Sequence, residues 1–220
     1  GIGPIMNYLG INRGNRMLTL TSMASKQRGL SIRYARKYGS EKEFRMGDVI
    51  TTMIRCSNGE TILMTHDTSL PRPYSRAGRV QGTNGLWLED GNLIYLEDRS
   101  PDKEKHAWEC FDKHLEEFEH PLWKKKDSYE QFGHGGMDSL VLRAFLHSVR
   151  HRIQTPIDAY DSATMTALSV LSEMSIAQGS APLSIPDYTF GKWVCRPPAP
   201  KSIYALDQVH EDLFAGEIEL

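Results

Sequence analysis

The stretch GDVITTMIRCSNGETILMTHDTSL (47–70) carries the clearest fold signal in the chain. It contains two apolar runs rich in β-branched residues, near 48–56 and 60–68, joined by Ser-Asn-Gly at 57–59. Asn-Gly between such runs is the strongest short-range signal of a β-hairpin, because a type I′ turn needs a positive φ at both central residues. The stretch therefore predicts two adjacent antiparallel strands.

Further strands are expected on both sides of this hairpin. Residues 15–25 have the pattern of a strand rich in Leu and Thr, and a basic segment with a short helix near 31–39 follows. Residues 78–98 predict a meander of three short strands, at about 79–81, 86–89 and 92–97. Consecutive antiparallel strands joined by short turns suggest one sheet.

The second half of the chain has helical periodicity. Residues 100–133 are charged and carry one apolar stripe, which Pro121 should end; its members are Trp108, Phe111, Leu115 and Phe118. A second helix is expected after the glycine-rich step, with Asp138 or Ser139 as its N-cap. We expect its apolar face to be packed. That face is formed by Leu142, Phe145, Leu146, Val149 and Ile153.

A last helix is expected from about 159 to 178. Asp158 or Asp161 can cap its start, and Gly179 is typical of the residue that follows a helix end. Strands first and helices after predict an α+β fold: an open-faced, mostly antiparallel sheet with helices packed on one face.

Composition excludes several classes of protein. The net charge of −2 gives no basic stripe for nucleic acid, and no apolar run approaches the 18 residues that suggest a membrane span. The chain opens with GIGPIMNYLGINRGNR (1–16), without an initiator Met or a signal peptide. We therefore expect a fragment or a processed product.

His106, Cys110 and His114 have the spacing i, i+4, i+8, which on a helix could face one metal ion. They fall mostly opposite the apolar stripe, among Lys and Glu residues. We therefore interpret them as a solvated helix face and predict no metal site.

The loop SLPRPYSRAGRVQG (69–82) is the first candidate site. Two prolines stiffen the backbone around Arg72, Tyr74 and Arg76. An aromatic hydroxyl between guanidinium groups can bind a polar ligand, and loops on a rigid sheet often carry function. The alternative is a strand-end loop with its tyrosine packed on the sheet.

The second candidate lies in QFGHGGMDSLVLRAFLHSVRHR (131–152), where His134 sits between glycines directly ahead of a helix. The glycines allow close approach of a ligand. The helix N-terminus favours a neutral imidazole and the binding of anionic or hydroxyl groups. The alternative is a glycine-rich connector with a surface histidine.

Five motifs in order resemble the C-terminal part of glycoside hydrolase family 109: LGINRGNR, PRPYSR…VQGTNGLW, HPLW, GHGGMD and TPIDAYDSATMTALSVLSEMSIAQGSAPLSIPDYT. Its members are NAD-dependent α-N-acetylgalactosaminidases within the Gfo/Idh/MocA oxidoreductase superfamily. The resemblance implies a substrate-binding domain over 1–193, and we expect a Pro-rich linker and tail over 194–220.

The resemblance further implies a carbohydrate substrate and the cofactor NAD, held mainly by an N-terminal Rossmann domain that this chain lacks. In such enzymes NAD oxidises the sugar at C3, elimination expels the aglycone, water adds, and the hydride returns. Members are often exported through a twin-arginine signal, but the end of the protein that would show one is absent here, so the compartment stays open.

Residue by residue, the resemblance implies catalytic roles for Tyr74 and His134 and a sugar or carbonyl contact for Arg76. A Tyr-x-x-His element precedes Gly-x-Gly-Pro in the family and is absent here, so we expect no catalysis by this chain alone. Two alternatives remain. The parent could be a sugar or inositol dehydrogenase, or the chain could be a non-catalytic domain that assembles into a homo-oligomer through its sheet.

Overall fold

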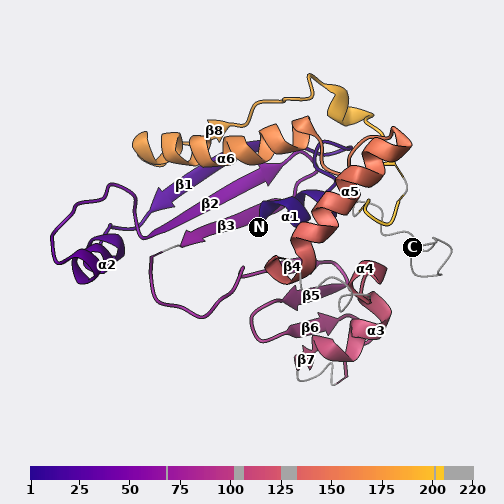
Figure 1. Cartoon of the computed structure of the whole chain (residues 1–220), viewed down its shortest axis with the longest axis horizontal. Helices are drawn as coiled ribbons and strands as arrows, with labels where there is room; N and C mark the ends of the chain where they lie inside the picture. Colours follow the sequence, from indigo (N-terminus) through magenta and orange to yellow (C-terminus); the bar gives the residue numbers. More distant parts are fainter. Residues whose placement is uncertain (68, 102–106, 125–132, 201, 206–220) are drawn as a thin grey trace. The chain divides into compact units, whose positions relative to one another are not determined.

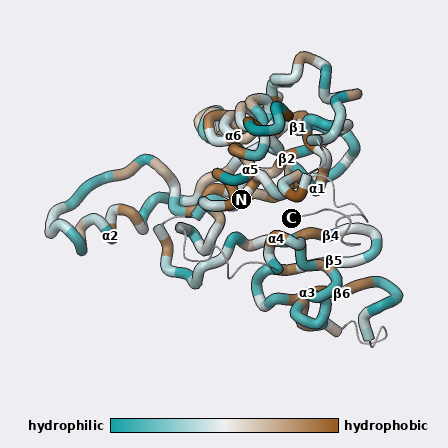
Figure 2. The backbone as a smooth tube through the Cα atoms, turned by 45° about the vertical axis from the view of Figure 1, so that its right-hand side comes forward, coloured by the Kyte–Doolittle hydropathy of each residue, from teal (hydrophilic) through white to brown (hydrophobic). Residues whose placement is uncertain are grey.

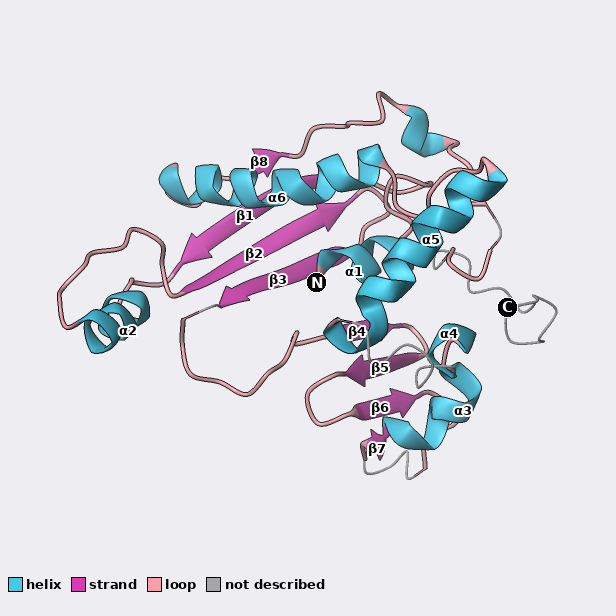
Figure 3. Ribbon diagram, in the orientation of Figure 1, coloured by secondary structure: helices cyan, strands magenta, loops and turns pink. Residues whose placement is uncertain are grey.

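The computed structural model describes residues 1–67, 69–101, 107–124, 133–200 and 202–205. The described residues form two compact units. The first unit combines residues 1–71 with the stretch from 143 to 205, and the second unit is formed by residues 72–142. Figures 1 and 3 show the elements of each unit.

The first unit is built on a four-stranded antiparallel sheet in the order β3-β2-β1-β8. Helix α6 lies along one face of this sheet, over β1 (Figure 1). The elements of the unit are α1 (Ile2–Tyr8), β1 (Met17–Ala24), α2 (Gly29–Tyr38), β2 (Val49–Cys56), β3 (Thr61–Asp67), α6 (Ala159–Ala177), β8 (Leu183–Ser184) and a 3₁₀ turn, η5 (Lys192–Val194). The loop that carries α2 is mainly hydrophilic (Figure 2).

The predicted hairpin is confirmed as β2–β3, but its turn is not type I′. Asn58 keeps a negative φ, and Gly59 alone in the turn has a positive φ, of +101°. The turn therefore has the features of a three-residue loop with a left-handed glycine. Asn58 is used elsewhere, because its side chain donates to Gly14 O at 3.2 Å and its N–H to Asn15 Oδ1 at 3.3 Å.

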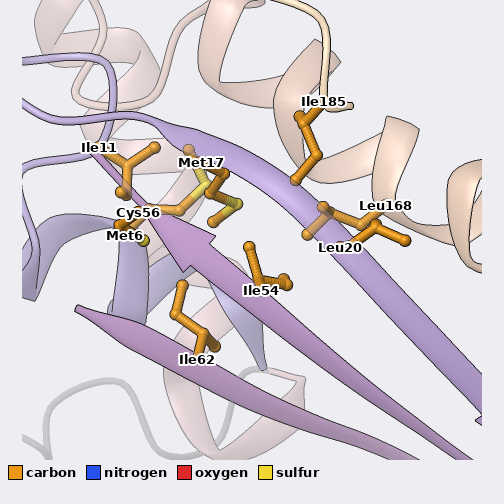
Figure 4. Packing of buried hydrophobic residues seen from close by; sticks show 9 residues of the cluster. All are labelled: Met6, Ile11, Met17, Leu20, Ile54, Cys56, Ile62, Leu168 and Ile185. Carbon is orange, nitrogen blue, oxygen red and sulfur yellow. The ribbon is translucent and has the colours of Figure 1, made fainter. Parts of the chain in front are cut away.

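The core of the first unit lies between the sheet and the helices that cover it. Along β2 the buried residues Thr52, Ile54 and Cys56 alternate with exposed ones, as a half-buried strand requires. Figure 4 shows the buried apolar cluster, which consists of Met6, Ile11, Met17, Leu20, Ile54, Cys56, Ile62, Leu168 and Ile185. Burial, with the Glu60 charge nearby, raises the pKa of the Cys56 thiol to about 11.

Small hydroxyl residues let α6 approach the sheet closely. Ser22 Oγ and Thr52 Oγ1 lie 2.8 Å apart, and Thr52 Oγ1 lies 3.3 Å from Ser172 Oγ on α6. Ser175 Oγ accepts the backbone N–H of Ser22 at 3.0 Å. The opposite face of the sheet is open, since the cross-strand pair Met53 and Leu63 is exposed.

The second unit contains a separate sheet in the order β4-β5-β6-β7, also antiparallel. Its elements are β4 (Arg79–Gly82), β5 (Gly85–Leu88), β6 (Leu93–Leu96), β7 (Glu109–Cys110), η2 (Phe111–His114), α3 (Leu115–Phe118), α4 (Pro121–Lys124), η4 (His134–Gly136) and the start of α5 (Met137–His151), which ends in the first unit. The α+β class and the predicted meander are thus confirmed, but the strands form two sheets.

The predicted helix through Trp108, Phe111, Leu115 and Phe118 is wrong in its first half. Glu109 pairs with Ile94 and Cys110 with Leu93, so this stretch is the edge strand β7 instead. Helix α3 ends before Pro121, and Pro121 is the first residue of α4. At the start of α4, His120 Nδ1 accepts the backbone N–H of Leu122 at 3.2 Å.

The expectation that the apolar face of α5 is packed is also wrong. Its residues Leu142, Phe145, Leu146 and Val149 are more than half exposed. The helix that covers the sheet is α6. Among the described residues, no helix is long and apolar enough to cross a membrane.

The predicted last helix is confirmed, and its start is fixed by a capping box. The Asp158 side chain accepts the N–H groups of Tyr160 and Asp161, and the Asp161 side chain accepts the N–H of Asp158. Gly179 follows the helix end with a φ of +72°.

Two arginines distant in sequence pair with these carboxylates. Arg13 donates to both oxygens of Asp161, at 3.2 and 2.9 Å, and Arg196 pairs with Asp158. Beyond Arg196, the side chains of Ala199, Ile203 and Ala205 are buried. These three residues of the expected linker and tail are therefore packed, whereas Val194, Cys195, Pro197 and Pro198 are exposed. The domain boundary at 193 stays a prediction.

Replacing the cap should destabilise the first unit strongly. Asp158→Ala removes the N-cap acceptor and leaves Arg196 without its nearest carboxylate, so we expect a loss of about 2–4 kcal/mol in the free energy of unfolding. Urea denaturation followed by circular dichroism measures it. Glu173→Ala, at an exposed position of the same helix, is the control; a loss for Asp158→Ala no larger than the control's would contradict the prediction.

The stability of the second unit should fall at mildly acidic pH because of His120. Burial lowers the pKa of His120, whereas an unfolded histidine takes up its proton near pH 6.5. Below about pH 6.5 protons therefore bind preferentially to the unfolded state, and the free energy of unfolding falls. His120→Asn keeps a cap acceptor but does not titrate. Urea unfolding at pH 7.5 and 5.5 should show a smaller drop for the variant; equal drops would exclude His120 as a source.

Candidate functional site

The three residues singled out by the sequence all lie in the second unit. Tyr74 and Arg76 belong to the loop ahead of β4, and His134 belongs to the η4 turn ahead of α5. The structure brings Tyr74 and Arg76 into contact. Among the described residues, no hydrogen bond joins either of them to His134.

The Tyr74 loop is held by the carboxylate of Glu89, the turn residue directly after β5. Glu89 Oε2 accepts the backbone N–H of Arg76 at 3.2 Å and that of Gly78 at 2.9 Å. The Glu89 N–H in turn donates to Gly78 O at 2.8 Å. A Cβ at Gly78 would lie only 2.9 Å from the Trp87 ring, so this position requires a glycine.

Tyr74 is presented outward. Its side chain is 83% exposed, so the alternative of a tyrosine packed on the sheet is wrong. The Arg76 Nε–H donates to the Tyr74 hydroxyl at 3.3 Å. Arg72 instead donates to the loop carbonyls of Ser75 and Pro73, at 2.9 and 3.3 Å. The Arg76 guanidinium therefore contacts the phenol, and the Arg72 guanidinium braces the loop backbone.

His134 sits on a strained turn. It and the two residues after it, Gly135 and Gly136, have positive φ values of +53°, +65° and +93°. An L-residue in this region costs roughly 1–2 kcal/mol. The His134 side chain is 76% exposed, and its Nδ1 lies 2.9 and 3.0 Å from the two oxygens of Asp138.

Asp138 was expected as a possible helix cap. It lies in the first turn of α5, and its carboxylate contacts the His134 ring. A Cβ at Gly133 would lie 2.4 Å from Asp138 Oδ2, so any other residue at this position would displace the carboxylate from where it contacts the ring. An exposed pair of this spacing stabilises a helix by about 0.3–0.5 kcal/mol, less than the strain of the turn. Stability alone does not account for the arrangement.

Sequence reasoning missed a polar cluster in the first unit. Asn12, with a φ of +66°, donates to Asp161 Oδ1 at 3.1 Å and to Thr164 Oγ1 at 3.2 Å, beside the Arg13–Asp161 pair. A small pocket adjoins it, lined by Gly3, Met6, Asn7, Arg13, Ile157, Asp161 and Met165. The INRGN motif was the available signal, but its partners lie about 150 residues away in the chain. We interpret the cluster as a clamp that holds the loop after α1 on α6.

No metal-binding cluster of three or more His, Cys, Asp or Glu side chains occurs in the part of the chain that is described. His106 lies outside that part. Cys110 ends β7 and is exposed, whereas His114 is largely buried 3.7 Å from Glu109. The expectation that these residues share one solvated helix face is therefore wrong for Cys110 and His114.

The residues of this chain do not fit a dinucleotide by themselves. A nicotinamide dinucleotide site of the Rossmann type needs a strand, a Gly-x-Gly-x-x-Gly turn and a helix. No Gly-x-Gly-x-x-Gly spacing occurs in the sequence. No step of a reaction is therefore assigned to such a cofactor on these residues.

Comparison with known proteins gives one family. The model described as "Glycosyl hydrolase 109, C-terminal domain" matches residues 1–195. An alpha-N-acetylgalactosaminidase of Tannerella forsythia is 46% identical over 205 residues, which are 90% of this chain and 43% of that protein. A glycosyl hydrolase family 109 protein of Stenotrophomonas maltophilia (strain K279a) is 47% identical over 214 residues, 94% of this chain and 46% of that protein.

Among solved structures, an oxidoreductase domain protein from Kribbella flavida matches with a TM-score of 0.51. The alignment covers 79% of this chain and 47% of that one, at 13% identity, and so supports the fold alone. The chain spans a little under half the length of the curated relatives described above.

Removing the Glu89 carboxylate should loosen the Tyr74 loop without unfolding the sheet. Glu89→Ala deletes the acceptor of the Arg76 and Gly78 amides, so these two amides should exchange with solvent at least tenfold faster. Hydrogen exchange read by NMR measures this, and Asp90→Ala, at the exposed neighbouring position, is the control. Unchanged exchange at both amides would show that the loop is held by other contacts.

Proposed function

Because the chain belongs to glycosyl hydrolase family 109, as its C-terminal domain, we propose that it is the substrate-side half of a glycosidase acting on α-N-acetylgalactosaminides. The observation that carries the proposal is the family match over residues 1–195, which includes the exposed Tyr74–Arg76 pair and the His134 turn. The name of the Tannerella forsythia relative supports the choice of sugar.

In this proposal Tyr74 and Arg76 act as one group. The exposed phenol is free on its outer side to reach a sugar hydroxyl, while the Arg76 guanidinium donates to its oxygen. We propose that Tyr74 gives up and regains a proton during the reaction, while Arg76 orients its hydroxyl. Arg76 can also donate to a carbonyl or hydroxyl of the substrate.

His134 has the second role. Its Nδ1 is occupied by Asp138, so Nε2 is the ring nitrogen left for a ligand. We propose that Nε2 exchanges a proton with the sugar or the leaving group. No pair of carboxylates at the spacing of ordinary glycosidases is required by this chemistry.

The proposed cofactor is NAD, placed on the amino-terminal half that the longer relatives contain, in a Rossmann domain. The cycle we propose is oxidation, elimination, addition and reduction, in which NAD supplies the hydride transfer and side chains supply the proton transfers. Since this chain carries no dinucleotide turn, we propose that it is inactive alone, and that the amino-terminal domain is its partner.

One alternative is a sugar or inositol dehydrogenase of the same fold. The two activities are separable in a full-length protein that carries this chain, incubated with an aryl α-N-acetylgalactosaminide and no added NAD. Release of the aryl group with no net NAD reduction supports the glycosidase. Reduction of added NAD by a free sugar, without aryl release, supports the dehydrogenase.

A second alternative is assembly through the open face of the first sheet, where Met53 and Leu63 are exposed. Exposed apolar residues in adjacent strands can pair with another copy. Light scattering of the chain at high concentration tests this, and a clean monomer would count against it.

Tyr74→Phe should lower kcat in the full-length protein by about 100-fold, the range expected for loss of one general acid or base. Aryl release under saturating substrate measures it. Tyr38→Phe, an exposed tyrosine on α2, is the matched control and should leave kcat unchanged. Equal activity of Tyr74→Phe and the wild type would remove Tyr74 from the chemistry.

A further inference from the structure

In the hydrogen bond between His134 and Asp138, the donor and the acceptor can be assigned. A carboxylate only accepts hydrogen bonds, and a neutral imidazole carries its proton on one ring nitrogen. Because Asp138 lies 2.9 and 3.0 Å from Nδ1, the proton of the neutral ring must lie on Nδ1. Nε2 is then the unprotonated nitrogen, on a side chain that is mostly exposed.

We infer that Asp138 is a positioning residue, which holds His134 in the Nδ1–H tautomer and aims Nε2 as a proton acceptor. The inference rests on the proposed function, in which His134 borders the sugar.

The glycines of this motif support the inference independently of each other. Gly133 leaves the carboxylate in its present place, because a Cβ there would meet Asp138 Oδ2 at 2.4 Å and the carboxylate would have to shift. Gly135 is needed for conformation, because its φ is +65° although nothing lies within 4 Å of the Cβ position. One glycine thus admits the carboxylate, and the other allows the turn that carries the ring.

An ordinary surface ion pair would explain the contact but not its surroundings. Such a pair needs no room made for it by a missing Cβ, and it needs no positive φ at the histidine. The strain at His134 exceeds what an exposed pair contributes to stability. The geometry is therefore better explained by the orientation of the ring than by helix stability.

The tautomer can be measured on this chain without any activity. Long-range ¹H–¹⁵N NMR of the imidazole rings, at a pH where His134 is neutral, should show Nδ1 protonated and Nε2 unprotonated; His134→Gln assigns the signals. Asp138→Ala should move the proton to Nε2 in part or fully. Asp90→Ala, in the same unit, should change nothing. An Nε2–H tautomer in the wild type, or no change in Asp138→Ala, would overturn the inference.

Gly133→Ala should also break the contact between His134 and Asp138. Its Cβ displaces the carboxylate that Asp138→Ala removes. Each variant should give the same tautomer shift, and the double variant should add nothing further, because both act on one contact. Additive effects would show that Gly133 acts otherwise.

Kinetics of the full-length protein separate this inference from the proposed function. Asp138→Ala should lower kcat 10- to 100-fold with little change in KM, and should shift the pH profile of kcat; Asp138→Glu should restore part of the rate. If His134→Gln lowers kcat but Asp138→Ala does not, the positioning role is wrong. If neither variant lowers kcat while the NMR shows the Nδ1–H tautomer, the proposed role of His134 fails and the tautomer assignment stands.

Discussion

The first unit depends on the pairing of two buried carboxylates with two arginines at the start of α6. Asp158 and Asp161 are almost fully buried, and a buried carboxylate is tolerated only when it is paired and hydrogen-bonded. Arg13 reaches them from the loop after α1, and Arg196 reaches them from the Pro-rich segment near the end of the described chain. Removing any one partner leaves an uncompensated charge in the interior. The ion pairs therefore hold the loop after α1, the start of α6 and the segment around Arg196 together. The helix that they fix is the one that covers the sheet.

The second unit uses carboxylates differently, to hold exposed groups in place. Glu89 accepts two backbone N–H groups of the Tyr74 loop, and Asp138 contacts the ring of His134. In both cases the carboxylate belongs to a regular element or its end, and the candidate site residue belongs to a loop. The loops owe their shape to hydrogen bonds and to glycines at Gly78 and Gly133, where a Cβ would meet a neighbouring side chain.

The parts of the fold that the sequence predicted are those set by local pattern. The hairpin follows from its two β-branched runs and the glycine between them, although the turn type does not, and the helix at 159–177 follows from capping and a helix-ending glycine. The failures involve distant partners. Glu109 and Cys110 lie within the stretch expected to be helical but pair with β6, and the apolar face of α5 is exposed. Tyr74, Arg76 and His134 could be named from motifs, whereas Asp138, Glu89 and Asn12 were not assigned their contacts, since these depend on three-dimensional placement.

The three free thiols lie in contrasting surroundings. Cys56 is buried in the core with its pKa raised to about 11, whereas Cys110 and Cys195 are exposed. Since the thiolate is the reactive form, an alkylating reagent at neutral pH modifies the two exposed cysteines in the folded protein and reaches Cys56 only when the hairpin core opens. Cys56 is thus a built-in probe of local unfolding in the first unit. The rate at which its thiol is alkylated reports how often strand β2 separates from α6.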